Sequence, residues 1–327
     1  MLNYNINTKN TVIFLFALFF ACIVSFQLFG YSNDYNLYKQ MLLSDDFNVE
    51  PIWFLLKCVN KIFFSQIYLL IFVTSFFSMY VKFSILKESL SDYYFIAIIC
   101  YFFSIFWLHE YTQFRASLAI SMFCLLIKPN QRKSKIFLIC LLCTLFHYSC
   151  LVLFPLIFYL NFKKKVCYIL FPTVLLLFSL FISTILRDSN FLLLILSNFS
   201  DNPFIEILIS KLGHNSSEFS VLNLLYLFLF FLLFLSYFFG IREKKCVDNY
   251  YYLCFKLSSY SLCLFYIFSL TPFPVVAFRT SEFFLLFYIV LLIKNLTYIK
   301  EKFFYAVFVF VYMILLSVKM LTSTGRL

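Results

Sequence analysis

Charged residues and glycine are both scarce in this chain of 327 residues. Only 13% of the residues are charged, and there are 4 glycines against 50 phenylalanines, whereas roughly a quarter of a soluble domain is charged. The sequence contains no Walker motif, no glycine-rich nucleotide loop and no internal repeat, which are the patterns of phosphate-binding loops and repeat folds. The chain therefore offers no soluble catalytic domain.

Long apolar runs are what the sequence has in abundance. Hydrophobic residues make up 63% of the chain, and its mean hydropathy is +0.93. Runs of about 17 to 20 residues recur along the whole length, which is the length needed to cross a bilayer core. The runs are continuous rather than alternating, which excludes a membrane β-barrel. We predict an all-α, polytopic integral membrane protein, a single transmembrane domain over 1–327 with about 9 to 11 transmembrane helices.

The expected membrane spans can be placed from these runs. They are residues 11–29, 65–81, 92–108, 113–127, 166–186, 221–240, 251–270, 275–293 and 303–320. Short basic clusters lie between them, at Lys82/Lys87, Lys128–Lys135, Lys163–Lys165, Arg242–Lys245 and Lys294–Lys302. Because lysine and arginine concentrate in cytoplasmic loops, we place these clusters, and the N-terminus with Lys9, in the cytoplasm. The net charge of +11 then reflects topology, and no nucleic-acid partner is predicted.

The connections between spans that carry no basic cluster are expected to face outward. They include an outer loop at 30–50 and a large outer loop at 187–220, in which no spacing dictates chemistry. The segment 51–64 has apolar residues at helical spacing with lysine and asparagine between them, which predicts an amphipathic helix in the outer interface or an extension of the second span. Because the sequence contains no soluble catalytic domain, any donor substrate must be bound within or beside the membrane.

The segment 136–160 raises a problem of topology, because a basic cluster precedes it and another follows it. Its 25 residues are enough to cross a bilayer once but not twice. One interpretation is a re-entrant hairpin that turns near His147, and the other is one long span with one basic cluster outside. We favour the hairpin. A turn at that depth must be buried in protein or face an aqueous cavity.

Arginines near the outer ends of two spans suit the binding of a phosphate. Arg115 opens the span after the polar stretch Trp107–Arg115, and Arg279 follows two prolines that break the helix before it. The planar guanidinium matches phosphate oxygens with two parallel hydrogen bonds. We predict that both arginines contact a pyrophosphate, with Glu110 and Gln113 as further substrate contacts beside Arg115.

A histidine and two carboxylates are the candidates for acid–base chemistry. His147 is predicted to be a base for a sugar hydroxyl, because a histidine can shift its pKa toward neutral pH. Asp34 and Glu50 are alternative bases, or ligands of sugar hydroxyls. Their spacing is not that of a metal site, and we predict no metal and no cofactor. The aromatic residues Tyr35, Tyr38 and Tyr148 suit sugar stacking, although tyrosine also suits a membrane interface.

The order of these residues resembles a known family. Asp34-Tyr35-x-x-Tyr38 follows the first span, and then come Glu50-Pro51, Gln113-x-Arg115-x-x-x-Ala119, Phe146-His147-Tyr148-Ser149 and finally Arg279. This order is similar to that of the EpsG-type group of Wzy-like polysaccharide polymerases. The resemblance is weakest after residue 160, and Glu110 matches no part of it.

The resemblance implies a polymerase of O-antigen, capsule or exopolysaccharide repeat units. Members act on units carried on undecaprenyl pyrophosphate at the outer side of the bacterial inner membrane, by a metal-independent, inverting, GT-C-like transfer. By the same resemblance Arg115 and Arg279 hold the lipid pyrophosphates, and His147 or a carboxylate activates the acceptor. The implied partners are the lipid-linked oligosaccharide, the bilayer, a chain-length regulator and a flippase.

Two other functions stay open from the residues alone. One is a membrane acyl- or glycosyltransferase that modifies surface sugars, because histidines and arginines also serve acyl transfer. The other is a lipid-linked oligosaccharide flippase, although the sequence has no inverted repeat and few glycine or proline breaks within spans.

Overall fold

The structure is a computed structural model of the whole chain. It describes residues 2–28, 30, 32, 34–43, 50–63, 66–162, 164–187, 223–242, 248–269, 274–298, 305–307, 309–311 and 313–314. Within these ranges every regular element is a helix. The predicted all-α class is thereby confirmed. The described chain separates into two compact units, the first with residues 1–158, 248–251 and 289–327 and the second with residues 159–247 and 252–288.

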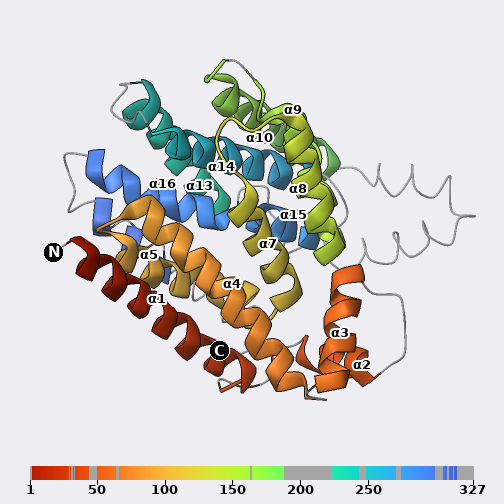
Figure 1. The fold of residues 1–327 in the computed structure, drawn as a ribbon. Helices are drawn as coiled ribbons and strands as arrows, with labels where there is room; N and C mark the ends of the chain where they lie inside the picture. Colours follow the sequence, from red (N-terminus) through yellow and green to blue (C-terminus); the bar gives the residue numbers. More distant parts are fainter. Residues whose placement is uncertain are drawn as a thin grey trace, which may run out of the picture. The chain divides into compact units, whose positions relative to one another are not determined.

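The first unit contains most of the N-terminal half of the chain (Figure 1). Its helices are α1 (Leu2–Ser25), α2 (Tyr35–Leu43), α3 (Pro51–Phe63), α4 (Ile67–Leu90), α5 (Tyr94–Tyr101), the π-helix η1 (Phe102–Phe106), α6 (Trp107–His109), α7 (Phe114–Leu126), α8 (Lys133–Phe146) and the 3-10 helix η2 (Tyr148–Leu153), which is followed by the short α9 (Leu156–Tyr159). Helix α4 packs against α1 on one side and α7 on the other, and α7 packs against α8.

The second unit holds most of the remaining helices. They are α10 (Cys167–Arg187), α13 (Leu224–Leu235), the π-helix η3 (Ser236–Arg242), α14 (Asn249–Ser269), α15 (Pro274–Glu282) and α16 (Leu285–Tyr298), of which α14 and α16 also contribute residues to the first unit. Tyr226 of α13 stacks on Phe265 of α14, with ring centroids 3.5 Å apart, and its hydroxyl bonds to the hydroxyl of Ser281 on α15. These contacts tie α13, α14 and α15 together.

Several helices are suited to crossing a membrane. By length and composition they are Thr8–Ser25, Ile67–Leu90, Leu224–Arg242 and Asn249–Ser269, with a fifth if the pair Val276–Glu282 and Leu285–Leu296, bent by 54°, counts as one span. Shorter apolar helices cover Tyr94–His109, Phe114–Leu126 and Cys167–Ile182, where further spans are expected. The last expected span, 303–320, lies largely outside the described residues. The chain is a multi-pass membrane protein.

Small residues allow α4 and α7 to approach closely. Ser75 and Ser78 of α4 and Ser117, Ala119 and Ser121 of α7 are all fully buried. Small side chains at a helix contact let two backbones come near each other, which is how helices associate in a membrane. This contact fixes the start of α7, which carries Arg115.

The chain reverses direction at His147, which joins α8 to η2. His147 has an extended backbone, with φ −157° and ψ 123°. Beyond it the ring of Phe154 packs on that of Phe137, with centroids 5.5 Å apart, and the Cys140 thiol donates to the carbonyl of Leu153 at 3.3 Å. This reversal is the geometry that a re-entrant hairpin at 136–160 needs, and its position in a membrane remains a prediction.

The segment before the second span is helical and has an inverted amphipathic pattern. On α3 the polar residues Lys57 and Asn60 are buried, whereas Leu55, Val59 and Ile62 are 41–76% exposed. An apolar outer face is stable only against an apolar surrounding, which fits a helix in contact with lipid. The loop 30–50, which is predicted to face outward, contains α2. Its residues 44–49 lie outside the described residues, and so does almost all of the loop 187–220.

Candidate functional site

A carboxylate, an arginine and a histidine from three separate segments of the first unit meet at one point. The guanidinium of Arg115 donates through Nη1 to Oε2 of Glu50 at 2.7 Å. The other carboxylate oxygen, Oε1, lies 2.7 Å from Nδ1 of His147. The two oxygens of Glu50 therefore bind different partners, and the three side chains form what we call the Glu50 cluster.

Each member of the Glu50 cluster lies at the end of a helix. Glu50 immediately precedes Pro51, the first residue of α3, and its carbonyl accepts from Phe54 N at 2.9 Å. Proline is favoured at the first helical position, and a carboxylate is favoured near a helix N-terminus. Arg115 is the second residue of α7, and His147 directly follows the last residue of α8. These helix ends converge because α3 packs against α8, and α8 against α7.

The Glu50 carboxylate is buried and ionised. Burial raises the pKa of Glu50, but the hydrogen bond with His147 and the charge of Arg115 outweigh that effect and lower the pKa to about 2. Hydrogen bonds between ionised partners are shorter and stronger than neutral ones. The side chains of Arg115 and His147 are 13% and 21% exposed, so both retain access to a ligand from outside.

Aromatic rings surround the guanidinium of Arg115. Its Cζ lies 5.1 Å from the ring centroid of Tyr38 and 5.8 Å from that of Trp53, and Phe114 packs against both rings. A guanidinium over aromatic faces is held in position by cation–π attraction. Nε of Arg115 is buried and has no hydrogen-bond partner among the described residues. Burial raises the pKa of Tyr38 to about 12, so its hydroxyl stays protonated.

The far nitrogen of His147 faces a serine. Nε2 lies 3.1 Å from Oγ of Ser149. Because a carboxylate can only accept, a neutral His147 donates from Nδ1 to Glu50 and leaves Nε2 as an acceptor. The hydroxyl of Ser149 then donates to Nε2. The arrangement can withdraw a proton from a hydroxyl placed at Nε2 and stabilise the resulting imidazolium through Glu50.

Other residues predicted for the site belong to the segments that carry the Glu50 cluster or to the neighbouring helix α2. Asp34 is half-buried at the start of α2, where its charge acts on Tyr38. Tyr35 is buried, and its ring lies 6.5 Å from that of Tyr68. Gln113 precedes α7, and its carbonyl accepts from Ser117 N at 2.9 Å. Tyr148 is 53% exposed.

The two remaining predicted residues are Arg279 and Glu110. Arg279 is an exposed residue of α15 in the second unit. Glu110 is fully buried in the first unit and pairs with Lys82 of α4, Nζ to Oε1 at 2.6 Å. Lys82, which the charge pattern assigns to a cytoplasmic cluster, is thus a buried residue, because its charge is matched by a partner that follows the next span.

Two residues of the site were not singled out from the sequence. Trp53 follows Glu50 by three residues, where a tryptophan is equally typical of an interfacial belt. Ser149 is the last residue of the Phe146-His147-Tyr148-Ser149 motif. The only sign in the sequence that Ser149 belongs to the site is its position two residues after His147. The extended backbone of His147, which brings Oγ of Ser149 to Nε2, cannot be predicted from that spacing.

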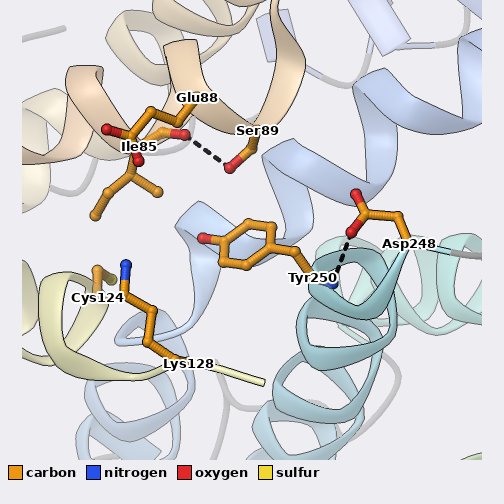
Figure 2. A pocket seen from close by; sticks show the side chains of 7 residues that line it. All are labelled: Ile85, Glu88, Ser89, Cys124, Lys128, Asp248 and Tyr250. Carbon is orange, nitrogen blue, oxygen red and sulfur yellow. Dashed lines mark hydrogen bonds between the residues drawn. The ribbon is translucent and has the colours of Figure 1, made fainter. Parts of the chain in front are cut away.

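A separate pocket lies between α4, α7 and the start of α14, within the first unit (Figure 2). It has a volume of about 250 Å³ and is lined by Ile85, Glu88, Ser89, Cys124, Lys128, Asp248 and Tyr250. The two hydrogen bonds drawn there are local, from Ser89 Oγ to the carbonyl of Ile85 and from Tyr250 N to Asp248. None of the predicted site residues lines it. Among the described residues, no group of three or more metal-ligating side chains occurs there or elsewhere.

Comparison with known proteins adds one finding. The family model described as "EpsG family" matches residues 10–326, nearly the whole chain. No curated protein and no solved structure matches.

Proposed function

Because the chain belongs to the EpsG family, whose members are linked to polysaccharide biosynthesis, we propose that it is a polysaccharide polymerase. It joins oligosaccharide repeat units carried on undecaprenyl pyrophosphate at the outer face of the bacterial inner membrane. The observation that carries the proposal is the Glu50 cluster, in which one carboxylate orients a base and a cation.

The base is His147, acting through Nε2. The acceptor hydroxyl gives its proton to Nε2 while its oxygen forms a bond to C1 of the donor sugar. The bond from C1 to the pyrophosphate oxygen breaks, and the lipid pyrophosphate leaves with the electron pair. Attack from the face opposite the leaving group inverts C1. Positioned proton transfer of this kind contributes about 10² to 10⁴ in rate, and Glu50 stabilises the imidazolium that forms.

The cation is Arg115, which binds the leaving pyrophosphate. Its Nε has no partner in the described residues, and the guanidinium remains partly exposed. A pyrophosphate competes with Glu50 for the guanidinium, because both are anions that take paired N–H donors.

Ser149 holds the place of the acceptor when no substrate is bound. Its hydroxyl lies 3.1 Å from Nε2 of His147, which is the distance at which an acceptor hydroxyl must sit for proton transfer. The acceptor sugar displaces this hydroxyl. Arg279, exposed on α15, is assigned to the pyrophosphate of the second lipid-linked unit, and Asp34, Tyr35 and Tyr148 to sugar contacts.

The proposed setting rests on the topology predicted from the basic clusters. The N-terminus is cytoplasmic, and the Glu50 cluster opens toward the periplasm or cell exterior. A flippase supplies the lipid-linked units there, and a chain-length regulator acts on the product. The fold proposed for this transfer is GT-C-like.

Surface polysaccharide from a strain lacking the gene tests the proposal. Complementation with Arg115→Ala or His147→Ala should leave only single repeat units on a gel, whereas the wild-type gene restores the ladder. Arg132→Ala is the matched control, because Arg132 is an exposed arginine at the start of α8, outside the Glu50 cluster. Wild-type chain lengths in the Arg115 and His147 variants, at normal protein levels, would contradict the site assignment.

A second candidate function is acyl transfer onto surface sugars. It is favoured by the series of hydrogen bonds that joins Ser149 to His147 and His147 to Glu50. A serine, a histidine and a carboxylate in series are the arrangement of serine acyl-transfer enzymes. A fluorophosphonate probe tests it: Ser149 Oγ would bond to phosphorus, fluoride would leave, and the proton would pass to Nε2. Labelling of the wild-type protein that is lost in Ser149→Ala, together with an intact polysaccharide ladder in the deletion strain, would favour this function.

A further inference from the structure

The first unit contains a second group of polar side chains that the proposed mechanism does not use. Lys82 of α4 and Glu110 are both fully buried and form an ion pair, with Nζ and Oε1 2.6 Å apart. Ser117 of α7 forms a hydrogen bond with each member of the ion pair. Its hydroxyl accepts from Lys82 Nζ at 2.6 Å and donates to Glu110 Oε1 at 2.6 Å. We call these residues, with Ser78 and Tyr101, the Lys82 network.

Donors from three helices converge on a single oxygen of Glu110. Besides Lys82 and Ser117, Oε1 accepts from Ser78 Oγ of α4 at 3.0 Å and from the hydroxyl of Tyr101 on α5. The other oxygen, Oε2, is buried without a hydrogen-bond partner among the described residues. Ser121, one turn further along α7, bonds to Ser78 at 2.7 Å. The network therefore fixes α7 to α4 at two successive turns.

Stability alone does not explain an ion pair at this position. Two charges lose their hydration on burial, and their mutual attraction compensates for that loss only with excellent geometry. A well-packed apolar pair of similar volume is often as stable. Ionisable residues within the apolar part of a membrane protein are costly and generally mark function. The π-helix η1, a form frequent at functional sites, ends four residues before Glu110.

The Lys82 network is linked to Arg115 through the backbone of α7. Ser117 lies two residues after Arg115 on α7, and Glu110 begins the short connection that leads into that helix. Tyr111, next to Glu110, is anchored by its hydroxyl to the carbonyl of Gly30 at 2.8 Å. The chain is thus fixed on both sides of Arg115, before the start of α7 and after its first turn.

We propose that Lys82 and Glu110 are positioning residues, which set the register of α7 against α4 and so place the guanidinium of Arg115 between Glu50 and the substrate phosphate. The proposal rests on the phosphate-binding role assigned to Arg115 under the proposed function, but not on polymerisation itself. Neither residue touches the substrate. A displacement of about 1 Å at a site of this kind is enough to weaken function strongly.

Binding of farnesyl pyrophosphate to the full-length protein in lipid nanodiscs tests the proposal. The double variant Lys82→Met with Glu110→Gln removes both charges together, so that neither is left buried alone. We expect its Kd to rise at least tenfold, in the direction of Arg115→Ala, while its Tm stays close to that of the wild type. Thr74→Val is the matched control, because Thr74 is buried on the same helix and bonds only to carbonyls of α4.

Ser117→Ala supplies a second measurement should the double variant fail to fold. It leaves the ion pair in place and removes the hydroxyl through which the pair holds α7, so the Kd should again rise. A wild-type Kd in Ser117→Ala, or in a folded double variant, overturns the proposal. A wild-type Kd in Arg115→Ala overturns both this proposal and the phosphate role of Arg115. If the variants weaken binding but chain lengths in cells stay normal, the positioning role stands and the polymerase function fails.

Discussion

Glu50 and His147 are 97 residues apart in the chain, and their side chains meet at 2.7 Å. The contact commits Nδ1 of His147 to the carboxylate and turns Nε2 toward Ser149. A histidine in this position has one nitrogen oriented by an anion and the other available as a base, as in enzymes that activate a hydroxyl. The pair therefore leaves Nε2 as the nitrogen of His147 that can accept a proton.

Replacing Glu50 by Gln should lower kcat far more than it changes KM. Glutamine has nearly the same shape, but it removes the charge that stabilises the imidazolium and no longer selects the Nδ1–H tautomer. The expected loss in kcat is about 100-fold or more, measured as polymer formed from lipid-linked units by the purified protein. Glu88→Gln, at an exposed glutamate of α4, serves as control. A kcat within a few-fold of wild type would show that Glu50 does not orient the base.

The low pKa of Glu50 predicts a specific dependence of stability on pH. Its folded-state pKa, about 2, lies below the ordinary value of 4.5, so the unfolded state binds the proton more readily. This contribution is fully present above about pH 4.5 and is lost as the pH falls toward 2, with a total of about 3 kcal/mol. Unfolding in detergent at pH 5 and pH 3 should therefore show a larger loss for wild type than for Glu50→Gln. Equal losses would mean that the carboxylate is not held as an ion.

Arg115→Lys should weaken binding of the lipid-linked substrate although the charge is kept. An ammonium lacks the planar fork and cannot lie flat between Tyr38 and Trp53 while it also reaches Glu50. Loss of a charge-assisted hydrogen bond corresponds to about 10- to 100-fold in affinity. The measurement is Kd or KM for the lipid-linked donor, with Arg132→Lys as control. Wild-type affinity in Arg115→Lys would exclude paired recognition by the guanidinium.

Ser149→Ala separates the two candidate functions. In the polymerase Ser149 only occupies the acceptor position, so its removal should leave kcat within about threefold of wild type, since no transition-state contact is lost. In an acyl-transfer enzyme Ser149 is the nucleophile, and its loss should abolish activity. Polysaccharide chain length and the substitution of the sugars, measured on the same cells, distinguish the outcomes.

Local sequence motifs predicted the members of the Glu50 cluster but not their contacts. Glu50, Arg115 and His147 each lie at a polar break between apolar runs, which is a signal that hydropathy and charge patterns can reveal. Their meeting depends on how α3, α7 and α8 pack, and no short-range pattern encodes that packing. The same holds for the rings of Tyr38 and Trp53 beside the Arg115 guanidinium. Their sequence positions are equally typical of an interfacial belt, because only the packing of the helices brings them to Arg115.

The Lys82 network shows where reasoning from charge patterns fails. A lysine near the end of an apolar run is usually cytoplasmic, and a carboxylate beyond the next run belongs by the same rule to the other side. The structure pairs Lys82 with Glu110, with Nζ and Oε1 2.6 Å apart. From the sequence, Ser78, Ser117 and Ser121 are expected to be small residues at a helix contact. Their hydroxyls instead form the hydrogen bonds that lower the free-energy cost of burying the Lys82–Glu110 ion pair.

For variants of the Lys82–Glu110 ion pair, the loss in the free energy of unfolding should depend on which charge is left buried without a partner. Lys82→Met leaves the Glu110 carboxylate buried without its cation, and breaking a buried pair in this way costs about 3–5 kcal/mol. Adding Glu110→Gln to Lys82→Met removes the stranded charge, so most of the loss in stability should be recovered. Chemical unfolding of the wild type, the two single variants and the double variant in detergent gives the coupling free energy directly. Additive losses in the double variant would mean that the two side chains do not act as a pair, because each would then contribute to stability without the other.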